Sequence, residues 1–367
     1  MRRIQKTNHF LWSLTLVILT VGFLALISAS SVIGEQRYGD VFYFVKKQLF
    51  QGILLGLFLA WIVSKINYRS WKKWALVLLG ANIFFLLLGF IPAFQLSGVT
   101  ARRWVRVGPV SAQPSEFLKL TYIIFLSTLL AKFSLKERRR ILGKPFLWYL
   151  FTLALIGGIL VKQPSTGTLL VLSFSTLVVY FGAGMSSKQM IAIILIGVIA
   201  LSFVISRSNY RRNRIMSFFS PQSDPLGKGY QALQSLIGIG SGGIWGVGFG
   251  HSVQKFNYLP QSHTDAIFAI IAEEFGFIGS CFIIILYFLF LLVGLKISRN
   301  SPDKFGKFLA LGLTANIVFQ AFINIGAMCK LLPITGIPLP FISYGGSAMV
   351  TNLISVGLLS NIAKQAR

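Results

Sequence analysis

The stretch FLWSLTLVILTVGFLALISASSVI, residues 10–33, contains 24 residues and not one charged side chain. A helix that crosses the hydrocarbon core of a bilayer needs about 20 such residues. The run is longer than the apolar region of a secretory signal, and no small-residue cleavage site leads from it into a soluble domain. We therefore interpret it as the first membrane-spanning helix of the chain.

Similar apolar runs recur along all 367 residues, of which 54% are hydrophobic and only 12% charged. A soluble domain carries about 25% charged residues. The sequence therefore predicts an all-α polytopic membrane protein with one domain, residues 1–367, and about ten transmembrane helices. The predicted spans are residues 10–33, 47–64, 74–92, 117–131, 146–162, 168–183, 189–206, 266–294, 308–327 and 345–363.

The charge of the chain is strongly basic, with 35 Lys and Arg against nine Asp and Glu. Basic residues gather in short loops between spans, at residues 65–73, 132–144 and 296–307. Cytoplasmic N and C termini place these loops, and 20 of the 35 basic residues, on the inner side. This is the positive-inside pattern, in which anionic membrane lipids are the counter-surface. It argues against nucleic acid as a partner.

Three outward loops carry the polar residues of interest. Loop A comprises residues 101–120, and the long loop B, between helices 7 and 8, comprises residues 207–265. Loop A contains Arg102, Arg103 and Arg106, whose guanidinium groups suit either a phosphate of a substrate or lipid headgroups. Both interpretations stay open. Glu116 and Lys119 follow at a spacing of three residues, which predicts an ion pair on one helix face.

Loop C, residues 331–346, is rich in proline and glycine and has no titratable acid or base of its own. Its composition predicts a rigid re-entrant turn. The glycine segment, residues 238–250 with the sequence GIGSGGIWGVGFG, contains a formal GxGxxG match. A nucleotide site needs that motif between a strand and a helix, a context that is missing here. We expect instead that glycine lets this loop fold back where side chains would clash.

Three of the nine acids lie within ten positions, as Asp265, Glu273 and Glu274. In a helix Glu273 would lie about 12 Å beyond Asp265, too far for a glycosidase-type pair at about 5 to 9.5 Å. Asp265 then acts alone as a base, or it belongs to a helix-capping box formed by residues 262–265. His263 could orient Asp265, titrate with it, ligate a cation or be merely structural. Glu273 and Glu274 lie at membrane depth, where one of them could pair with a Lys or Arg that the sequence does not identify.

Four segments together resemble the SEDS family (shape, elongation, division and sporulation), whose members include FtsW and RodA. They are TARRWVRVGPVSAQPSEFLKL (100–120), DPLGKGYQALQSLIGIGSGG (224–243), QKFNYLPQSHTDAIFAIIAEEFGFIG (254–279) and LLPITGIPLPFISYGGSAMVTNLISVGLLSNI (331–362). The resemblance implies a peptidoglycan glycosyltransferase that polymerises lipid II on the outer face of the bacterial cytoplasmic membrane. Segments such as SVQKFNYLPQSHTD are more similar to FtsW, which favours septal synthesis in cell division over elongation.

The resemblance also implies roles for particular residues. It places the essential acid at Asp265 and the supporting Glu and Lys at Glu116 and Lys119. The remaining substrate-binding or supporting residues that we expect are Arg102, Arg103, His263, Gln254 and Lys255. A divalent cation, Mg²⁺ or Mn²⁺, is a possible cofactor. The implied partners are a class B penicillin-binding protein, which is a transpeptidase, and other membrane proteins of the division machinery.

The sequence departs from the family pattern at three positions. Ser165 stands where an acid usually follows the proline of KQPSTGT, Gln261 stands where Glu is common, and Ala266 stands where Phe usually follows the essential acid. A lipid II flippase is the alternative function, since it too would have many spans and buried ionisable residues. A flippase usually shows inverted repeats and a polar path through the membrane. We detect no repeat, and the three polar loops share one side.

Overall fold

The computed structural model describes residues 2–95, 103–107, 110–207, 212, 216, 218, 219 and 227–365. Arg102 lies outside these residues. The α-helices are α1 (Arg2–Tyr38), α2 (Tyr43–Gln48), α3 (Leu55–Lys65), α4 (Trp71–Leu88), α5 (Pro114–Lys132), α6 (Leu135–Arg139), α7 (Lys144–Lys162), α8 (Thr166–Gly182), α9 (Ser187–Ser206), α11 (Lys228–Ser241), α12 (Ile267–Arg299), α13 (Lys304–Met328) and α14 (Gly346–Lys364). A π-helical turn, Leu49–Leu54, joins α2 to α3. The strands β1 (Val105–Val107) and β2 (Val110–Ala112) form a small antiparallel hairpin in loop A.

The predicted membrane fold is confirmed. Within the described part of the chain, nine helices are long and apolar enough to cross a bilayer, and α8 is a shorter apolar helix of 17 residues. Each of the ten predicted spans coincides with one of these helices. The hairpin in loop A and helix α11 in loop B are additional elements that the apolar pattern does not predict.

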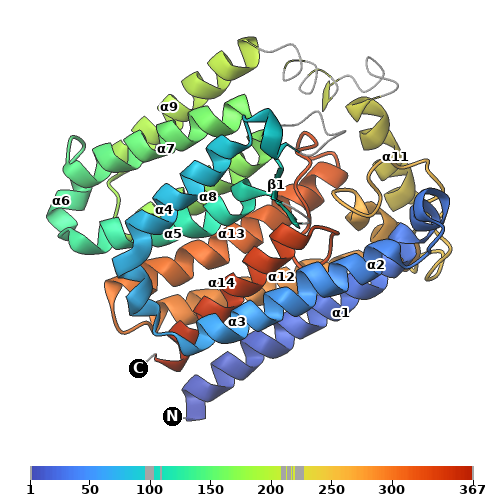
Figure 1. Ribbon diagram of the computed structural model, residues 1–367, viewed down its shortest axis with the longest axis horizontal. Helices are drawn as coiled ribbons and strands as arrows, with labels where there is room; N and C mark the ends of the chain where they lie inside the picture. The colour runs from blue at the N-terminus through green and yellow to red at the C-terminus, as the bar shows by residue number, and fades with distance from the viewer. Residues whose placement is uncertain are drawn as a thin grey trace.

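The ends of the helices separate the basic loops from the polar loops. Both chain termini lie at the same end of the bundle as α6, whereas α11 and the β1 strand lie at the opposite end (Figure 1). An even number of crossings produces this arrangement. Loops A and B therefore open on the side opposite the termini, as predicted.

Helices α13 and α14 form the centre of the bundle. In the most apolar window of each, 83% and 89% of the residues are buried inside the protein. Helix α13 packs against α5, α8 and α12, and α14 packs against α1 and α3. By contrast, only 6% of the corresponding window of α9 is buried, so its apolar side chains face outward, where lipid would surround them. These two buried helices therefore support the outer loops.

Helix α12 is broken at Gly276, where φ is 65° and ψ is −161°. The glycine segment crosses this break and supplies the missing hydrogen bonds: the Val247 amide donates to the Glu273 carbonyl at 3.0 Å and the Phe277 amide to the Gly243 carbonyl at 2.9 Å. Irregular backbone is tolerated at membrane depth when protein groups satisfy it in this way. A Cβ atom on Gly246 would overlap the Glu274 carbonyl. Gly242 makes the same kind of approach, to the Ala272 carbonyl, so these two glycines let the segment fold against α12 where side chains would clash. By contrast, a Cβ on Gly240 or Gly243 of the GxGxxG match would have nothing within 4 Å.

Candidate functional site

Asp265 lies in an irregular turn at the outer end of the bundle, two residues before α12 begins. Its side chain is 7% exposed. One carboxylate oxygen, Oδ2, accepts a long hydrogen bond of 3.5 Å from Gln231 Nε2 of α11, and Oδ1 accepts one of 3.2 Å from Thr264 Oγ1. No Lys or Arg among the described residues forms an ion pair with Asp265. The carboxylate thus accepts only long hydrogen bonds from neutral groups, and its oxygens remain able to accept a proton.

The capping-box interpretation of residues 262–265 is wrong. The N-cap of α12 is Ala266, and no side chain caps the helix. Ser262 Oγ instead donates to the Ala29 carbonyl of α1 at 3.3 Å. The reason is the left-handed backbone of Gln261, with φ of 59°, which starts a turn in which the Ala266 amide bonds back to the Gln261 carbonyl at 3.2 Å. Because α12 begins only after this turn, the Asp265 carboxylate does not cap the helix.

His263 lies in an aromatic cluster. Its ring centroid is 4.5 Å from that of Phe44 and 5.8 Å from that of Tyr344. Burial, with a smaller contribution from Arg37, lowers the pKa of His263 to about 4, so the imidazole is neutral at physiological pH. In the described structure no hydrogen bond joins the side chains of His263 and Asp265. His263 therefore supports the Asp265 turn by packing.

The ion pair predicted in loop A is present. Lys119 Nζ lies 2.8 Å from Glu116 Oε2 near the outer end of α5, and both residues are only 2% exposed. The ammonium also donates to Gln320 Oε1 of α13. Arg103 is partly exposed at the start of the hairpin and Arg106 is exposed on β1. The pair is thus buried within the helices, while the described arginines of loop A lie nearer the surface.

Glu273 and Glu274 fix loop B to α12. Glu273 accepts hydrogen bonds from Ser252 Oγ and, at 3.0 Å, from the Val253 amide. Glu274 pairs with Lys255, whose Nζ lies 3.6 Å from Glu274 Oε1. The same ammonium donates to Ser28 Oγ of α1 at 3.2 Å and to the Gly250 carbonyl at 2.6 Å. The basic partner of Glu274 is therefore Lys255, whose ammonium combines this ion pair with two hydrogen bonds.

Gln254, another expected site residue, lies beside this cluster and is 6% exposed. Its backbone N–H donates to Glu273 Oε2 at 3.4 Å, and its side-chain Oε1 has no hydrogen-bond partner within the described residues. In this arrangement Gln254 and Lys255 hold the loop that leads to Asp265. Their direct contact with substrate stays a prediction.

Removing the ammonium from this cluster should destabilise the protein. Lys255→Met leaves Glu274 buried without its cation, and breaking a buried pair in this way costs about 3 to 5 kcal/mol. We expect a clear fall in the thermal unfolding midpoint of the detergent-solubilised protein. Lys46→Met is the matched control, because Lys46 forms an exposed pair with Asp40 at 2.9 Å, and exposed pairs contribute little to stability. Equal midpoints for the two variants would contradict the assignment.

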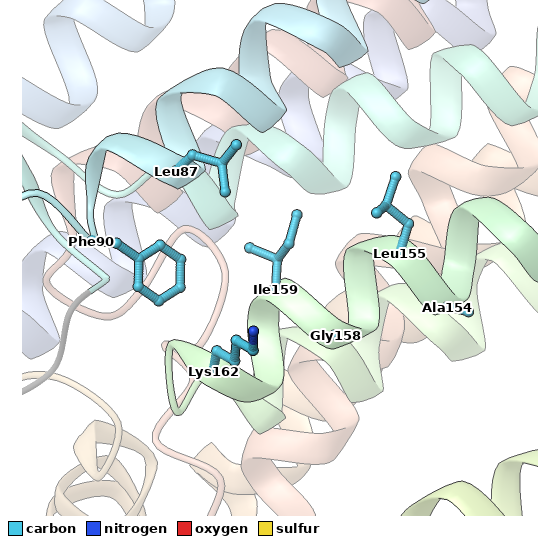
Figure 2. A pocket seen from close by; sticks show the side chains of 7 residues that line it. All are labelled: Leu87, Phe90, Ala154, Leu155, Gly158, Ile159 and Lys162. Atoms are coloured by element: carbon cyan, nitrogen blue, oxygen red, sulfur yellow. The ribbon is translucent and has the colours of Figure 1, made fainter.

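A separate apolar cavity of about 600 Å³ lies between α4 and α7 (Figure 2). Its lining is apolar except for Lys162 at the end of α7, and it consists of Leu87, Phe90, Ala154, Leu155, Gly158, Ile159 and Lys162. A sugar needs hydrogen-bonding groups around its hydroxyls, which this cavity lacks. We therefore do not place sugar chemistry there.

The described residues include no group of three or more His, Cys, Asp or Glu side chains that could hold a metal ion. Mg²⁺ is commonly bound by one or two carboxylates together with phosphates of a substrate. Asp265, a single carboxylate, fits that sparse mode of binding but forms no protein cage. A divalent cation thus stays a prediction.

Buried amides in the neighbourhood of Asp265 are functional candidates that the sequence analysis did not single out. Gln231 contacts the carboxylate, and Asn324 of α13 donates to the Asp265 carbonyl at 2.7 Å. Gln320 lies one turn before Asn324 and contacts Lys119. For Gln320 and Asn324 the available signal was polarity inside an apolar span, where a buried polar group needs a partner. Sequence alone could not identify partners 59 or 201 positions away.

Comparison with known proteins gives the family. The model of the FtsW/RodA/SpoVE family of cell cycle proteins matches residues 8–367. The chain belongs to this family. It is 39% identical to stage V sporulation protein E of Bacillus subtilis over 360 residues, 96% of each chain. It is 36% identical to the probable peptidoglycan glycosyltransferase FtsW of Trichlorobacter lovleyi, over 98% of this chain and 94% of the relative.

Solved structures of FtsW/RodA/SpoVE proteins and their complexes share the fold. One, described as the structural coordination of polymerization and crosslinking by a peptidoglycan synthase complex, has a TM-score of 0.74 at 26% identity over 96% of both chains. The rod shape determining protein RodA of Thermus thermophilus has a TM-score of 0.67 at 27% identity over 96% of this chain and 95% of its own. Together these similarities confirm the predicted family and glycosyltransferase class.

Proposed function

We propose that this chain polymerises lipid II into glycan strands on the outer face of the bacterial cytoplasmic membrane, with Asp265 as the general base. The observation that carries the proposal is the state of Asp265: a carboxylate at the outer end of the bundle, without a cationic partner among the described residues and not used as a helix cap. Such a group can take a proton from a substrate hydroxyl.

The substrate suits a membrane site because its parts prefer different surroundings. Lipid II carries a disaccharide on a diphosphate that is attached to a long polyprenyl chain. The chain can stay in the bilayer while the sugar reaches the polar loops, all of which lie on one side of the helices. The turn that contains Asp265 lies on this side.

In the proposed reaction Asp265 accepts the proton of the 4-hydroxyl group of the acceptor sugar. The resulting oxygen nucleophile forms a bond to the anomeric carbon of the donor, whose bond to the diphosphate oxygen breaks. The lipid diphosphate leaves with the electron pair, and the proton on Asp265 passes to solvent. Positive charge near the leaving group stabilises its growing negative charge. We assign that task to Arg103 and Arg106 of loop A, with Arg102, which lies outside the described residues, and a divalent cation as further candidates.

The proposed setting is septal cell-wall synthesis during division. Relatives named FtsW support this role, whereas another relative is a sporulation protein, and RodA is named for rod shape. We propose a class B penicillin-binding protein as partner, since the family works with transpeptidases that cross-link the new strands. Other membrane proteins of the division machinery and localisation at the septum belong to the same proposal.

Transport of lipid II without polymerisation is the alternative, and one experiment separates the two functions. Purified protein with its transpeptidase partner is incubated with labelled lipid II in detergent, where no bilayer separates two compartments. We expect glycan ladders on a gel, in amounts that grow with enzyme concentration. Absence of ladders, together with movement of labelled lipid II between leaflets in proteoliposomes, would overturn the proposal in favour of a flippase.

A further inference from the structure

We infer that Asn324 is a positioning residue that sets the place of Asp265 relative to loop C, and that Gln320 and the Glu116–Lys119 pair support it from behind. The inference rests on the proposed function, since it assumes that Asp265 is the base. The buried Glu116–Lys119 pair then affects the reaction by positioning loop C and does not contact the substrate.

Asn324 joins the two outer segments directly. Its side chain is 1% exposed, and its Nδ2 donates both to the Asp265 carbonyl at 2.7 Å and to the Ile337 carbonyl of loop C at 2.8 Å. An amide nitrogen has two N–H donors, and both are used here. Its Oδ1 has no hydrogen-bond partner in the described part of the chain. The useful property of Asn324 is therefore its pair of donors.

Loop C lies against Asp265 itself as well as against its backbone. A Cβ atom on Gly336, where φ is 68°, would lie 3.7 Å from Asp265 Oδ2. The Tyr344 amide donates to the His263 carbonyl at 3.0 Å, which is a second connection between the two segments. A shift of loop C would thus change the space next to the carboxylate, where the acceptor sugar must approach.

Gln320 connects the Glu116–Lys119 ion pair to loop C through hydrogen bonds at both ends of its side chain. A Gln side chain has one acceptor end and one donor end, while an ammonium group can only donate. Because Lys119 Nζ occupies Gln320 Oε1, the Nε2 end must point away from it, and it donates to the Pro338 carbonyl at 2.8 Å. Glu116 in turn stabilises the charge on Lys119. The pair therefore fixes which end of Gln320 faces loop C.

The two amides act from one rigid support. Gln320 and Asn324 are four residues apart on α13, which places them on one face about 6 Å apart along the axis. They hold the consecutive carbonyls of Ile337 and Pro338. Two residues of α13 thus hold loop C at the point where it passes Asp265.

The test is Asn324→Leu, which keeps a similar volume and removes both donors. We expect kcat for lipid II polymerisation to fall by about 10- to 100-fold with KM nearly unchanged, because a misplacement of about 1 Å costs up to about 100-fold. The acid limb of the pH–rate profile should also shift, since the surroundings of the base change. Asn316→Leu is the matched control: Asn316 is also buried on α13, and its side-chain oxygen has no hydrogen-bond partner within the described residues. It should keep wild-type kinetics.

A second variant covers the case in which Asn324→Leu fails to fold. Gln320→Glu keeps an acceptor for Lys119 but places an oxygen against the Pro338 carbonyl, and we expect a smaller fall in kcat, again with a shifted acid limb. Wild-type kcat and pH profile in a folded variant of either residue would overturn the inference, as would a rise in KM alone. Full activity of Asp265→Asn in the same assay would instead overturn the proposed function, so the two failures can be told apart.

Discussion

Replacing Asp265 by Asn should lower the rate of lipid II polymerisation by about 10²- to 10⁴-fold, the usual contribution of a positioned general base. Asn has nearly the same shape, and Gln231 and Thr264 can keep their contacts with its side chain. What is lost is the group that accepts the proton of the acceptor hydroxyl. The measurement is the initial rate of glycan synthesis by purified protein at saturating labelled lipid II.

Asp40→Asn is the control for the loss of an acid. Asp40 lies in the turn between α1 and α2 and forms an exposed pair with Lys46. Its removal should leave the rate within about twofold of wild type, since exposed pairs contribute little. Polymerisation at the wild-type rate by folded Asp265→Asn would show that another group takes the proton.

Adding a methyl group at Gly246 should destabilise the protein severely. Gly246 has φ of 85°, and a Cβ there would overlap the carbonyl of Glu274 in α12. The glycine segment could then no longer supply the hydrogen bonds that satisfy the break at Gly276. We expect Gly246→Ala to lose most folded protein, measured as the monodisperse yield after extraction in detergent and as the unfolding midpoint.

Gly250→Ala isolates the steric part of this prediction. Gly250 has a similar φ of 80°, but nothing lies within 4 Å of a Cβ placed there. It should cost only the strain of a left-handed residue, about 1 to 2 kcal/mol. If Gly246→Ala and Gly250→Ala lose the same stability, close packing against α12 is not the reason for a glycine at position 246.

Local patterns predicted the features that depend on nearby residues. Apolar length gave the ten spans, and a spacing of three residues gave the Glu116–Lys119 pair. The failures involve groups far apart in the chain. The capping-box interpretation of residues 262–265 was wrong because the backbone of Gln261 turns before the helix starts. Lys255 as the partner of Glu274, and Asn324 as the partner of Asp265, follow only from how α1, α12 and α13 pack.

The placement of the anchoring amides on α13 has a mechanical consequence. Bilayers of different thickness change the tilt of helices that lie in contact with lipid. Helix α9, which is almost entirely lipid-facing, is expected to adjust most, whereas α13 is enclosed by other helices. Asp265 and loop C are both hydrogen-bonded to α13. The distance between them should therefore change little with the thickness of the surrounding bilayer. A site built in this way is expected to keep its geometry in bilayers of different thickness.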